Sequence, residues 1–426
     1  MLHLRLQLPV GQGFFHAGWV HLSEDSPGYF YIYDCGSMTK YATACKREVK
    51  KLHGCVGNGA KLHLLVLSHM HADHVNGVPG LLKDEALKVD TIMMPLVNME
   101  DRLLSYAATV ANDPKAARTK FYRSFVVDPV AAVSRFQPRN ILLVRSGKGG
   151  APGGEPDEDG PLDGAPDIRG EGEGYFWKLV GRGSAEEKTR HSDGPIILTI
   201  PDSSALKIFE VGHWNDAWLL APYVDRDIRR NRNVFLEALA ASQSLSTSDL
   251  RNKLTDTEFL KRLLSRKKIG ALRKAYKACN RDLNLTSLCL YSGPSQNSFT
   301  DHRPCAHQGH RTMCGVPGRI GWLATGDARL GKTARVEAFV AHYKALTARV
   351  ATLTLPHHGS SPDFNDRLLA DIDPTVCTVA AGTFKNWQHP GARVVHAVTS
   401  AGALMFVANA EETTEIAEHV RSLSTT

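Results

Sequence analysis

Short apolar runs of strand length, separated by turns and by helical stretches, are the feature that most limits how this chain can fold. Runs such as Leu62–Leu67 and Val376–Ala380 contain no charged residue and are too short for buried helices. They form two groups, one beginning in the first third of the chain and one in the last third, and helical stretches follow each group. Two strand groups flanked by helices predict an α/β protein with a four-layer αββα sandwich rather than one doubly wound sheet.

The same pattern divides the chain into parts and predicts how it ends. The last third should alternate strands and helices and finish with a helix at Glu411–Ser422. The stretch between the two halves of the sandwich is much longer than such a fold needs, and we interpret it as a long, mainly helical insertion. The predicted parts are residues 1–97, the first half of the sandwich; residues 98–280, the insertion, with an acidic loop at 151–174, core strands near 195–224 and basic helices at 225–278; and residues 281–426, the second half.

Composition places the chain among ordinary globular proteins. Its 426 residues, 42% hydrophobic and 22% charged, are enough to bury a large core. No stretch approaches 18 consecutive apolar residues and the first residues show no secretion leader, so we predict a cytoplasmic protein with no membrane span. The eight cysteines are dispersed, and in such a protein they are predicted to be thiols rather than disulfides.

Four metal-ligand side chains follow the apolar run Leu62–Leu67 within six residues. They are His69, His71, Asp73 and His74, in the pattern HxHxDH. If the run is a strand, the first two can point to one side and hold one ion, while the other two lie past the bend and face a second ion. A strand end is rigid enough to hold such ligands in place. The spacing therefore predicts a metal site rather than structural histidines.

The HxHxDH segment resembles the signature of the metallo-β-lactamase fold hydrolases, and the resemblance extends over most of the chain. Thr325-Gly326-Asp327 matches the element of that family whose aspartate bridges two metals. The segment from Leu355 to Ser360 matches the last metal-binding element, in which one histidine completes the second site. The family usually places that ligand immediately before glycine, which favours His358, but His357 stays a candidate. The resemblance implies the αββα fold and two divalent ions, zinc or manganese.

Other motifs are similar to those of one branch of that family, the hydrolase domain of the ComEC competence proteins and the related choline-phosphoesterases. The VGQGD-like turn of the branch corresponds to Val10-Gly11-Gln12-Gly13-Phe14, with phenylalanine in place of aspartate. Its Asn-x-x-Ser-Leu strand corresponds to the segment from Asn284 to Leu288, and its late Asn-x-x-His-Pro to the segment from Asn386 to Pro390. The elements occur in the same order as in the branch.

The sequence departs from most members of the fold at the first metal. Most members carry a third histidine on the strand that enters the TGD element, where this chain offers Asn284 and Ser287. The branch departs in a similar way, so the resemblance implies a looser first site that is partly ligated by water. His16 and His213 are further candidate ligands, and otherwise they are ordinary residues near strand ends.

The resemblance implies hydrolysis of a phosphodiester. Two ions bridged by Asp327 would lower the pKa of water toward neutrality, so no protein nucleophile is needed. His389 could protonate the leaving group if the segment that begins at Asn386 reaches the pocket as it does in the branch; otherwise it packs in a loop. Asp73, His389 and Asn386 are therefore the candidate catalytic residues.

Charge is unevenly distributed along the chain. Residues 151–174 hold eight acidic residues and one arginine in a Gly/Pro-rich stretch, which predicts a flexible loop. Residues 251–277 hold ten basic and two acidic residues, which predicts a basic patch, or else only a solvated surface. Together with the resemblance, this patch favours DNA or RNA as the substrate. The candidate contacts are Arg262, Arg266, Lys267, Lys268, Arg273 and Lys274.

A second group of potential ligands lies between the Asn284 segment and the TGD element. Its members are His302, Cys305, His307, His310 and Cys314. Such a density of ligands could hold a structural zinc ion, but the spacing fits no standard zinc finger. A polar hairpin loop is the other interpretation.

Two other functions fit the same residues. One is a small-molecule or cell-wall phosphodiesterase, or an ester or lactone hydrolase, in which the basic helices are only surface. The other is a partner-binding subunit, whose insertion docks another protein and whose metal site is regulatory or vestigial. Stand-alone members of the branch resemble parts of multi-protein bacterial systems, so a partner ATPase or sensor is a further expectation.

Overall fold

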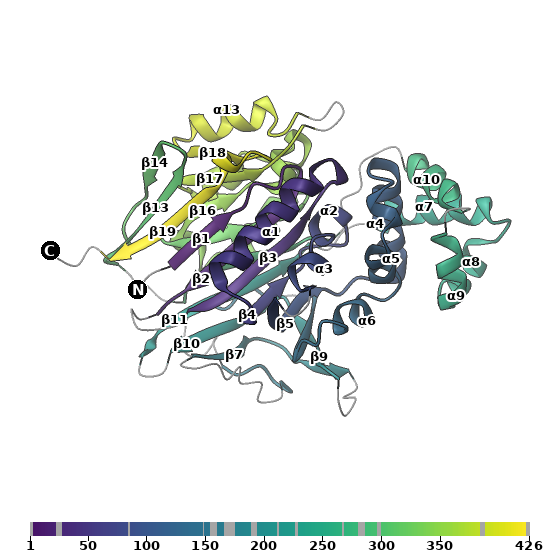
Figure 1. Ribbon diagram of the computed structural model, residues 1–426, viewed down its shortest axis with the longest axis horizontal. Helices are drawn as coiled ribbons and strands as arrows, with labels where there is room; N and C mark the ends of the chain where they lie inside the picture. Colours follow the sequence, from purple (N-terminus) through teal and green to yellow (C-terminus); the bar gives the residue numbers. More distant parts are fainter. Residues whose placement is uncertain are drawn as a thin grey trace.

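Strands of this protein form two large sheets that face each other, and helices cover their outer faces (Figure 1). The fold is described from a computed structural model. The description covers residues 3–22, 28–83, 86–147, 149–153, 160–165, 175–188, 194–210, 213–225, 229–265, 268–279, 286–295, 300–383 and 388–422.

The first sheet is mixed, and within the described residues its strand order is β14-β13-β19-β1-β2-β3-β4-β5-β6-β9-β8. Its strands are β1 (His3–Gln7), β2 (Gly13–Val20), β3 (Tyr29–Ser37), β4 (Ala60–Val66), β5 (Leu87–Pro95), β6 (Asn140–Arg145), β8 (Glu186–Lys188), β9 (Ile196–Pro201), β13 (His302–Gln308), β14 (Arg311–Cys314) and β19 (Ile416–Ser422). From β3 to β9 neighbouring strands run parallel, and the remaining pairs are antiparallel.

The second sheet is also mixed, with the order β18-β17-β16-β15-β12-β11-β10-β7 in the described part of the chain. Its strands are β7 (Tyr175–Gly181), β10 (Ser204–Glu210), β11 (His213–Val224), β12 (Leu288–Pro294), β15 (Gly321–Ala324), β16 (Val350–Thr354), β17 (Val376–Ala380) and β18 (Leu404–Ala408). From β15 to β18 the strands are parallel, and from β7 to β15 they are antiparallel.

Apolar side chains fill the space between the sheets and the space between each sheet and its helices. The helices on the first sheet are α1 (Ala42–Val56), α2 (Ala72–Val75), α3 (Val78–Leu81), α4 (Met99–Asn112), α5 (Lys120–Val127) and α6 (Pro129–Ser134), and those on the second are α11 (Thr333–His342), α12 (Arg367–Ile372) and α13 (Ala392–Ser400). The protein is thus of the α/β class, with two large mixed sheets flanked by helices. This arrangement is consistent with the predicted four-layer αββα sandwich.

The range predicted as an insertion contributes to both sheets as well as forming helices. Strands β6, β8 and β9 join the first sheet, and β7, β10 and β11 join the second. The part that leaves the sheets is a set of helices at one end of the molecule, beside α4 and α5 (Figure 1). We call it the helical arm; it consists of α7 (Arg229–Ser242), α8 (Thr247–Lys253), α9 (Thr257–Leu263) and α10 (Ile269–Ala278). Most of the predicted acidic loop, 154–159 and 166–174, lies outside the described residues.

The predicted C-terminal helix is wrong, because residues 416–422 form strand β19 between β1 and β13. Burial along β19 alternates, with Ile416, Glu418 and Val420 turned inward. Because the charged Glu418 occupies a buried position, the alternation of apolar and polar residues that marks a strand is not visible in the sequence. The carboxylate of Glu418 forms a buried ion pair with Arg5 of β1, and this pairing allows a charge at a core position.

In the described part of the chain, no helix combines the length and apolar character that crossing a lipid bilayer requires.

Candidate metal centre

The HxHxDH segment begins just after β4 and passes into the short helix α2. His71 is the last extended residue, and Asp73 falls in the first turn of the helix. The segment meets two others at the ends of β15 and β16. Potential ligand atoms gather in three groups, each within 4.8 Å, and two of them face the cleft: His69, His71 and Asp327, and Asp73, His74 and His358. The third, Asp34, His69 and His74, lies behind these two groups.

Asp327 lies between these two groups and turns one oxygen toward each. Its Oδ2 is 3.4 Å from Nε2 of His69. Its Oδ1 is 3.4 Å from Nε2 of His74 and 3.5 Å from Nε2 of His358. His357 approaches from the Oδ2 side, with its Nε2 at 3.9 Å. A buried carboxylate with one oxygen on each ligand group has the placement of a bridging ligand.

In four of the imidazoles, the ring nitrogen Nδ1 contacts a fixed hydrogen-bond partner. The partners of Nδ1 are Asp34 for His74 (2.7 Å), Asp363 for His357 (2.6 Å), the carbonyl oxygen of Ala380 for His358 (2.7 Å) and the hydroxyl of Ser68 for His69 (2.9 Å). The Ser68 hydroxyl itself donates to Asp34, so it accepts from His69. Because these groups accept, Nδ1 carries a proton in each ring, and Nε2 is the nitrogen that turns toward Asp327. Four Nε2 atoms therefore face the carboxylate of Asp327, and each can bind a cation once it carries no proton.

This arrangement fits a metal ion, because a bound cation would take the place of a proton between these nitrogens and the carboxylate. Nε2 of His69 is also only 3.2 Å from Nδ1 of His71. Two atoms held about 2.0–2.1 Å from a zinc ion at a tetrahedral angle are about 3.3 Å apart. The observed separations of 3.2–3.5 Å around Asp327 match that value. These side chains can therefore hold a metal ion.

The electrostatics of the cluster follow from its composition. Burial would raise the pKa of Asp327, but the imidazoles of His74, His358 and His69 hold that pKa well below its usual value. Burial would lower the pKa of His74, but the carboxylates of Asp327 and Asp34 hold it well above its usual value. Burial lowers the pKa of His71, with the neighbouring His69 acting in the same direction. Positive charge is thus favoured next to Asp327, where a cation would lie.

The histidine pair after β16 is held in a strained turn. His357 (φ 46°, ψ 58°) and His358 (φ 55°, ψ 24°) both have left-handed backbone, and Gly359 follows with φ 75°. Left-handed backbone costs a residue with a Cβ roughly 1–2 kcal/mol. The turn places two adjacent imidazoles against the same carboxylate, which an extended strand would point to opposite sides. Strain of this kind is concentrated at functional sites.

Ser287, which the sequence offered in place of the third histidine, supports the TGD loop. The amide of Asp327 donates to its hydroxyl at 3.0 Å. Gly326 has φ 51°, and a Cβ there would lie 2.4 Å from the same hydroxyl, so only glycine fits. His16 stacks on Trp322 at 3.9 Å between the sheets and belongs to neither ligand group. Asn284 and the side chain of His213 lie outside the described residues.

The candidate catalytic residues that the structure describes differ in where they lie relative to the ligand groups. Asp73 belongs to the second ligand group. His389 lies beside the histidine pair, with ring centroids 6.0 Å from His357 and 6.4 Å from His358. Burial, together with these two imidazoles, lowers the pKa of His389 to about 4, so its ring is neutral near pH 7. Asn386 lies outside the described residues.

A cleft with an empty volume of about 530 Å³ opens over the ligand groups. It exposes His71, Asp73, Asp327, His357 and His358. The remaining lining residues are Gln12, Met38, Ala72, Ala108, Thr109, Asn112, Asp113 and Tyr276 of α10. None of the described lining residues is a lysine or an arginine. Positive charge inside the cleft would therefore come from bound cations.

The predicted nucleic-acid contacts lie on the helical arm, away from the floor of the cleft. Arg262 at the end of α9 and Lys268, Arg273 and Lys274 at or on α10 are exposed. Arg266 and Lys267 lie outside the described residues.

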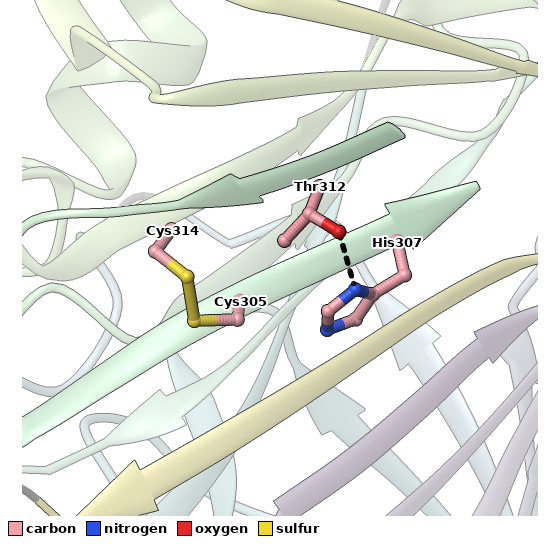
Figure 2. Close-up of a disulfide and its surroundings, with 4 residues drawn as sticks. All are labelled: Cys305, His307, Thr312 and Cys314. Carbon is pink, nitrogen blue, oxygen red and sulfur yellow. Dashed lines mark hydrogen bonds between the residues drawn. A yellow bond between two sulfur atoms is a disulfide. The ribbon is translucent and has the colours of Figure 1, made fainter. Parts of the chain in front are cut away.

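A structural zinc ion at the second cluster is not what the structure shows. Cys305 of β13 and Cys314 of β14 form a disulfide across this hairpin, so their sulfurs are bonded to each other (Figure 2). His307 instead pairs with the hydroxyl of Thr312 at 2.9 Å (Figure 2). His302 and His310 belong to no ligand group among the described residues. The prediction that all cysteines are thiols is also wrong at this pair, while the other six are free.

Sequence reasoning missed the residues that orient the ligands. Asp34 within β3 accepts from Ser68 and from His74, which are 34 and 40 positions away. Asp363 accepts from His357 and, at 3.0 Å, from Arg329. An acidic residue directly after an apolar, aromatic run, as Asp34 follows Tyr29 to Tyr33, is the signal that could have found the first of these.

A scan against protein-family models and a search of curated proteins found no match to this chain. The two mixed sheets and the buried His/Asp clusters are compatible with a metallo-β-lactamase-like fold.

Proposed function

We propose that this protein is a metal-dependent hydrolase of the metallo-β-lactamase fold, in the ComEC-like branch, that cleaves phosphodiester bonds with two divalent cations. The observation that carries the proposal is the carboxylate of Asp327, which offers one oxygen to each of two ligand groups. His69 and His71 would hold one cation, with His357 nearby, and Asp73, His74 and His358 the other. Zinc or manganese suits such a set of imidazoles and carboxylates.

Divalent cations in such a centre supply Lewis acidity and lower the pKa of water. Positioning of the phosphate and transfer of the proton depend on residues of the chain. The imidazoles and Asp327 fix where the phosphate lies, and the cleft that they line excludes bulk water. In the reaction a water oxygen bonds to phosphorus, the bond to the leaving oxygen breaks, and one water proton ends on that oxygen. His389, neutral near pH 7 and beside the histidine pair, is placed to pass this proton.

A phosphodiester is favoured by the charge of the cleft. Its described lining contains no lysine or arginine to neutralise a polyanionic group. A doubly esterified phosphate carries one negative charge, which the cations neutralise. The motifs shared with the ComEC-like branch favour the same bond. DNA or RNA is the preferred substrate within this class, because the helical arm beside the cleft exposes basic residues.

The test is hydrolysis by purified protein loaded with zinc or manganese. Bis-p-nitrophenyl phosphate, single- and double-stranded DNA, and RNA serve as substrates. We expect cleavage of the small ester and of at least one polymer, and loss of both activities in Asp73→Asn and His74→Ala. Asp90→Asn is the matched control, because Asp90 lies on β5 and pairs with Arg139 at 3.0 Å, away from the ligand groups.

The results separate the other functions. Cleavage of the ester alone would favour a small-molecule phosphodiesterase. No cleavage despite full metal occupancy would favour a partner-binding subunit, for example of an ATPase or sensor. Full activity in Asp73→Asn or His74→Ala would contradict the assignment of the site.

A further inference from the structure

We infer that the helical arm selects the substrate: α10 guides a single nucleic-acid strand into the metal cleft, and Tyr276, Arg273 and Lys277 contact that strand. The inference rests on the proposed function and names its substrate class. It assigns a specific role to one face of a helix that the sequence marked only as basic.

The placement of α10 is the first observation. Tyr276 lines the same cleft as Asp327 and the histidine pair, although it is about 50 positions from the nearest of them in sequence. It is 8% exposed, so it forms part of the wall rather than a mobile surface group. An aromatic ring at this place can contact the part of a substrate that extends from the scissile phosphate.

The arm is held firmly enough to serve as a wall. Leu272 and Ala275 of α10 are buried in the core that includes α4. The guanidinium of Arg273 donates to the carbonyl oxygen of Val110 in α4 at 3.2 Å. At its base, Arg232 of α7 donates twice to Asp101 of α4, at 2.7 and 2.8 Å. Packing and polar contacts thus fix α10 relative to the cleft.

The spacing of Arg273, Tyr276 and Lys277 puts their side chains next to one another on α10. Side chains three and four positions apart are neighbours on a helix. Arg273 is three positions before Tyr276 and four before Lys277, so the two cations lie along the same edge of α10 as the ring. A strand whose base meets Tyr276 would therefore have its flanking phosphates near these charges.

Part of the charge that the arm offers to a ligand lies on α10. Three cations on the other arm helices pair with carboxylates: Arg232 with Asp101 (2.7 Å), Arg251 with Glu100 (2.7 Å) and Lys261 with Glu258 (2.8 Å). Lys274 and Lys277 are exposed, and no described carboxylate lies within 4.0 Å of either. An unpaired lysine gains more from a phosphate than a paired one, because it does not first give up a partner.

Access to the site favours a single-stranded nucleic acid over a duplex. Asp327 is 4% exposed and His74 is fully buried, so the scissile phosphate must enter the cleft rather than rest on its rim. A single strand is flexible and can thread into it, whereas a duplex holds its backbone on a stiff rod. A basic track next to an aromatic side chain is also how sequence-tolerant single-strand binders are built.

Binding tests the inference without catalysis. The full chain is titrated, with a chelator present so that the probe stays intact, into a fluorescent 12-nucleotide oligothymidylate, and into the same strand paired with oligodeoxyadenylate. We expect the single strand to bind at least tenfold more tightly than the duplex. Lys277→Glu should weaken single-strand binding about tenfold and reduce the salt dependence, since fewer phosphates are neutralised. Tyr276→Ala should weaken it by a similar factor.

The matched control is Lys261→Glu, which makes the same change of charge on α9, on the far side of the arm (Figure 1). It should bind the strand as the unmodified protein does. Lys277 is exposed, so its variant tests the idea even if Tyr276→Ala does not fold. Equal affinity for strand and duplex, or an unaltered affinity in Lys277→Glu, would overturn the inference. Failure of the loaded protein to cleave bis-p-nitrophenyl phosphate would instead overturn the proposed function.

Discussion

The residues behind the imidazoles decide what the candidate site can bind. Asp34 accepts from both Ser68 and His74, and it touches no substrate-facing surface because it is fully buried. Its carboxylate accepts the Nδ1 proton of His74 and so turns Nε2 of that ring toward Asp327. The triad of Asp34, His69 and His74 is close enough to resemble a ligand group itself. Its contacts of 2.5–2.7 Å are hydrogen bonds, however, so we assign Asp34 to orientation rather than coordination.

Asp34→Asn should lower metal affinity about 10–100-fold, because orienting partners of a ligand histidine typically contribute that much. The variant keeps the size of the side chain but loses the charge and one acceptor. Competition titration against a chromophoric chelator measures the effect. Asp90→Asn, a carboxylate of β5 paired with Arg139, is the control that should leave metal affinity unchanged. An Asp34→Asn protein that binds metal as tightly as the unmodified one would remove Asp34 from the site.

The sequence predicted most of the candidate ligands but not how they are oriented. His69 to His74, Asp327 and the histidine pair were recognisable because their spacing and neighbours form motifs. Asp34 and Asp363 were not, because each is a single acidic residue whose partner is set by the fold. Whether His357 or His358 faces the second group was left open, and the left-handed turn that turns both toward Asp327 cannot be inferred from the letters alone.

At the scale of elements, β19 shows how one buried ion pair can make a prediction from the hydrophobic pattern wrong. The strand closes the first sheet between β1 and β13, and Glu418 at its centre faces Arg5. Glu418 also accepts from Thr352 of the second sheet at 2.6 Å, so it connects the two sheets. Helix formers on either side and a charge at a core position made this segment resemble an amphipathic helix. The apolar run Val376–Ala380 has no such charge, and it forms strand β17 with the same bounds.

Glu418→Leu should lower the free energy of unfolding by about 3–5 kcal/mol, because it leaves the guanidinium of Arg5 buried without its partner. The double variant Arg5→Met with Glu418→Leu should recover much of that loss, since no charge stays buried. Urea unfolding measures both. Glu415→Gln is the control, because Glu415 forms a surface pair with Lys51 at 2.7 Å and should change stability by at most about 1 kcal/mol. Equal losses in the single and double variants would contradict this account.

The β1–β2 hairpin should make stability depend on pH. Burial, with Arg5 acting in the same direction, lowers the pKa of His16 well below 6.5, and neither ring nitrogen has a hydrogen-bond partner. Below about pH 6.5 the unfolded chain therefore binds a proton that the folded protein does not, and stability falls as the pH falls. His16→Phe removes this term, so its unfolding free energy should fall less steeply, by up to about 1.4 kcal/mol per pH unit.

Urea unfolding of chelator-treated protein at pH 7, 6 and 5 gives these slopes. His3→Phe should act in the same direction, because burial also lowers the pKa of His3. Slopes that both variants leave unchanged would show that these histidines do not set the pH dependence.

At the scale of the whole molecule, the candidate site exists only when distant parts of the chain meet. Its ligands follow β4 of the first sheet and β15 and β16 of the second, and they span residues 69–358. The layer architecture could be predicted, because two groups of strands separated by helices have few compact solutions. The contribution of 98–280 to both sheets could not be predicted fully, because short strands such as β6 and β7 lie among loops and helices in the sequence. The wall that Tyr276 adds to the cleft depends on how the arm packs, which no local pattern encodes.

Because the ligands come from both sheets, metal binding should stabilise the fold as a whole. A ligand that binds only the folded state adds RT ln(1 + [L]/Kd) to the free energy of unfolding, about 4 kcal/mol at a thousandfold excess over Kd. Removing metal with a chelator should therefore lower the thermal midpoint, and added zinc or manganese should restore it. His358→Ala, which loses one ligand from the second group, should respond less than the unmodified protein. An equal response would mean that the stabilising metal binds elsewhere, and no response in either protein would mean that the imidazoles around Asp327 do not hold a metal.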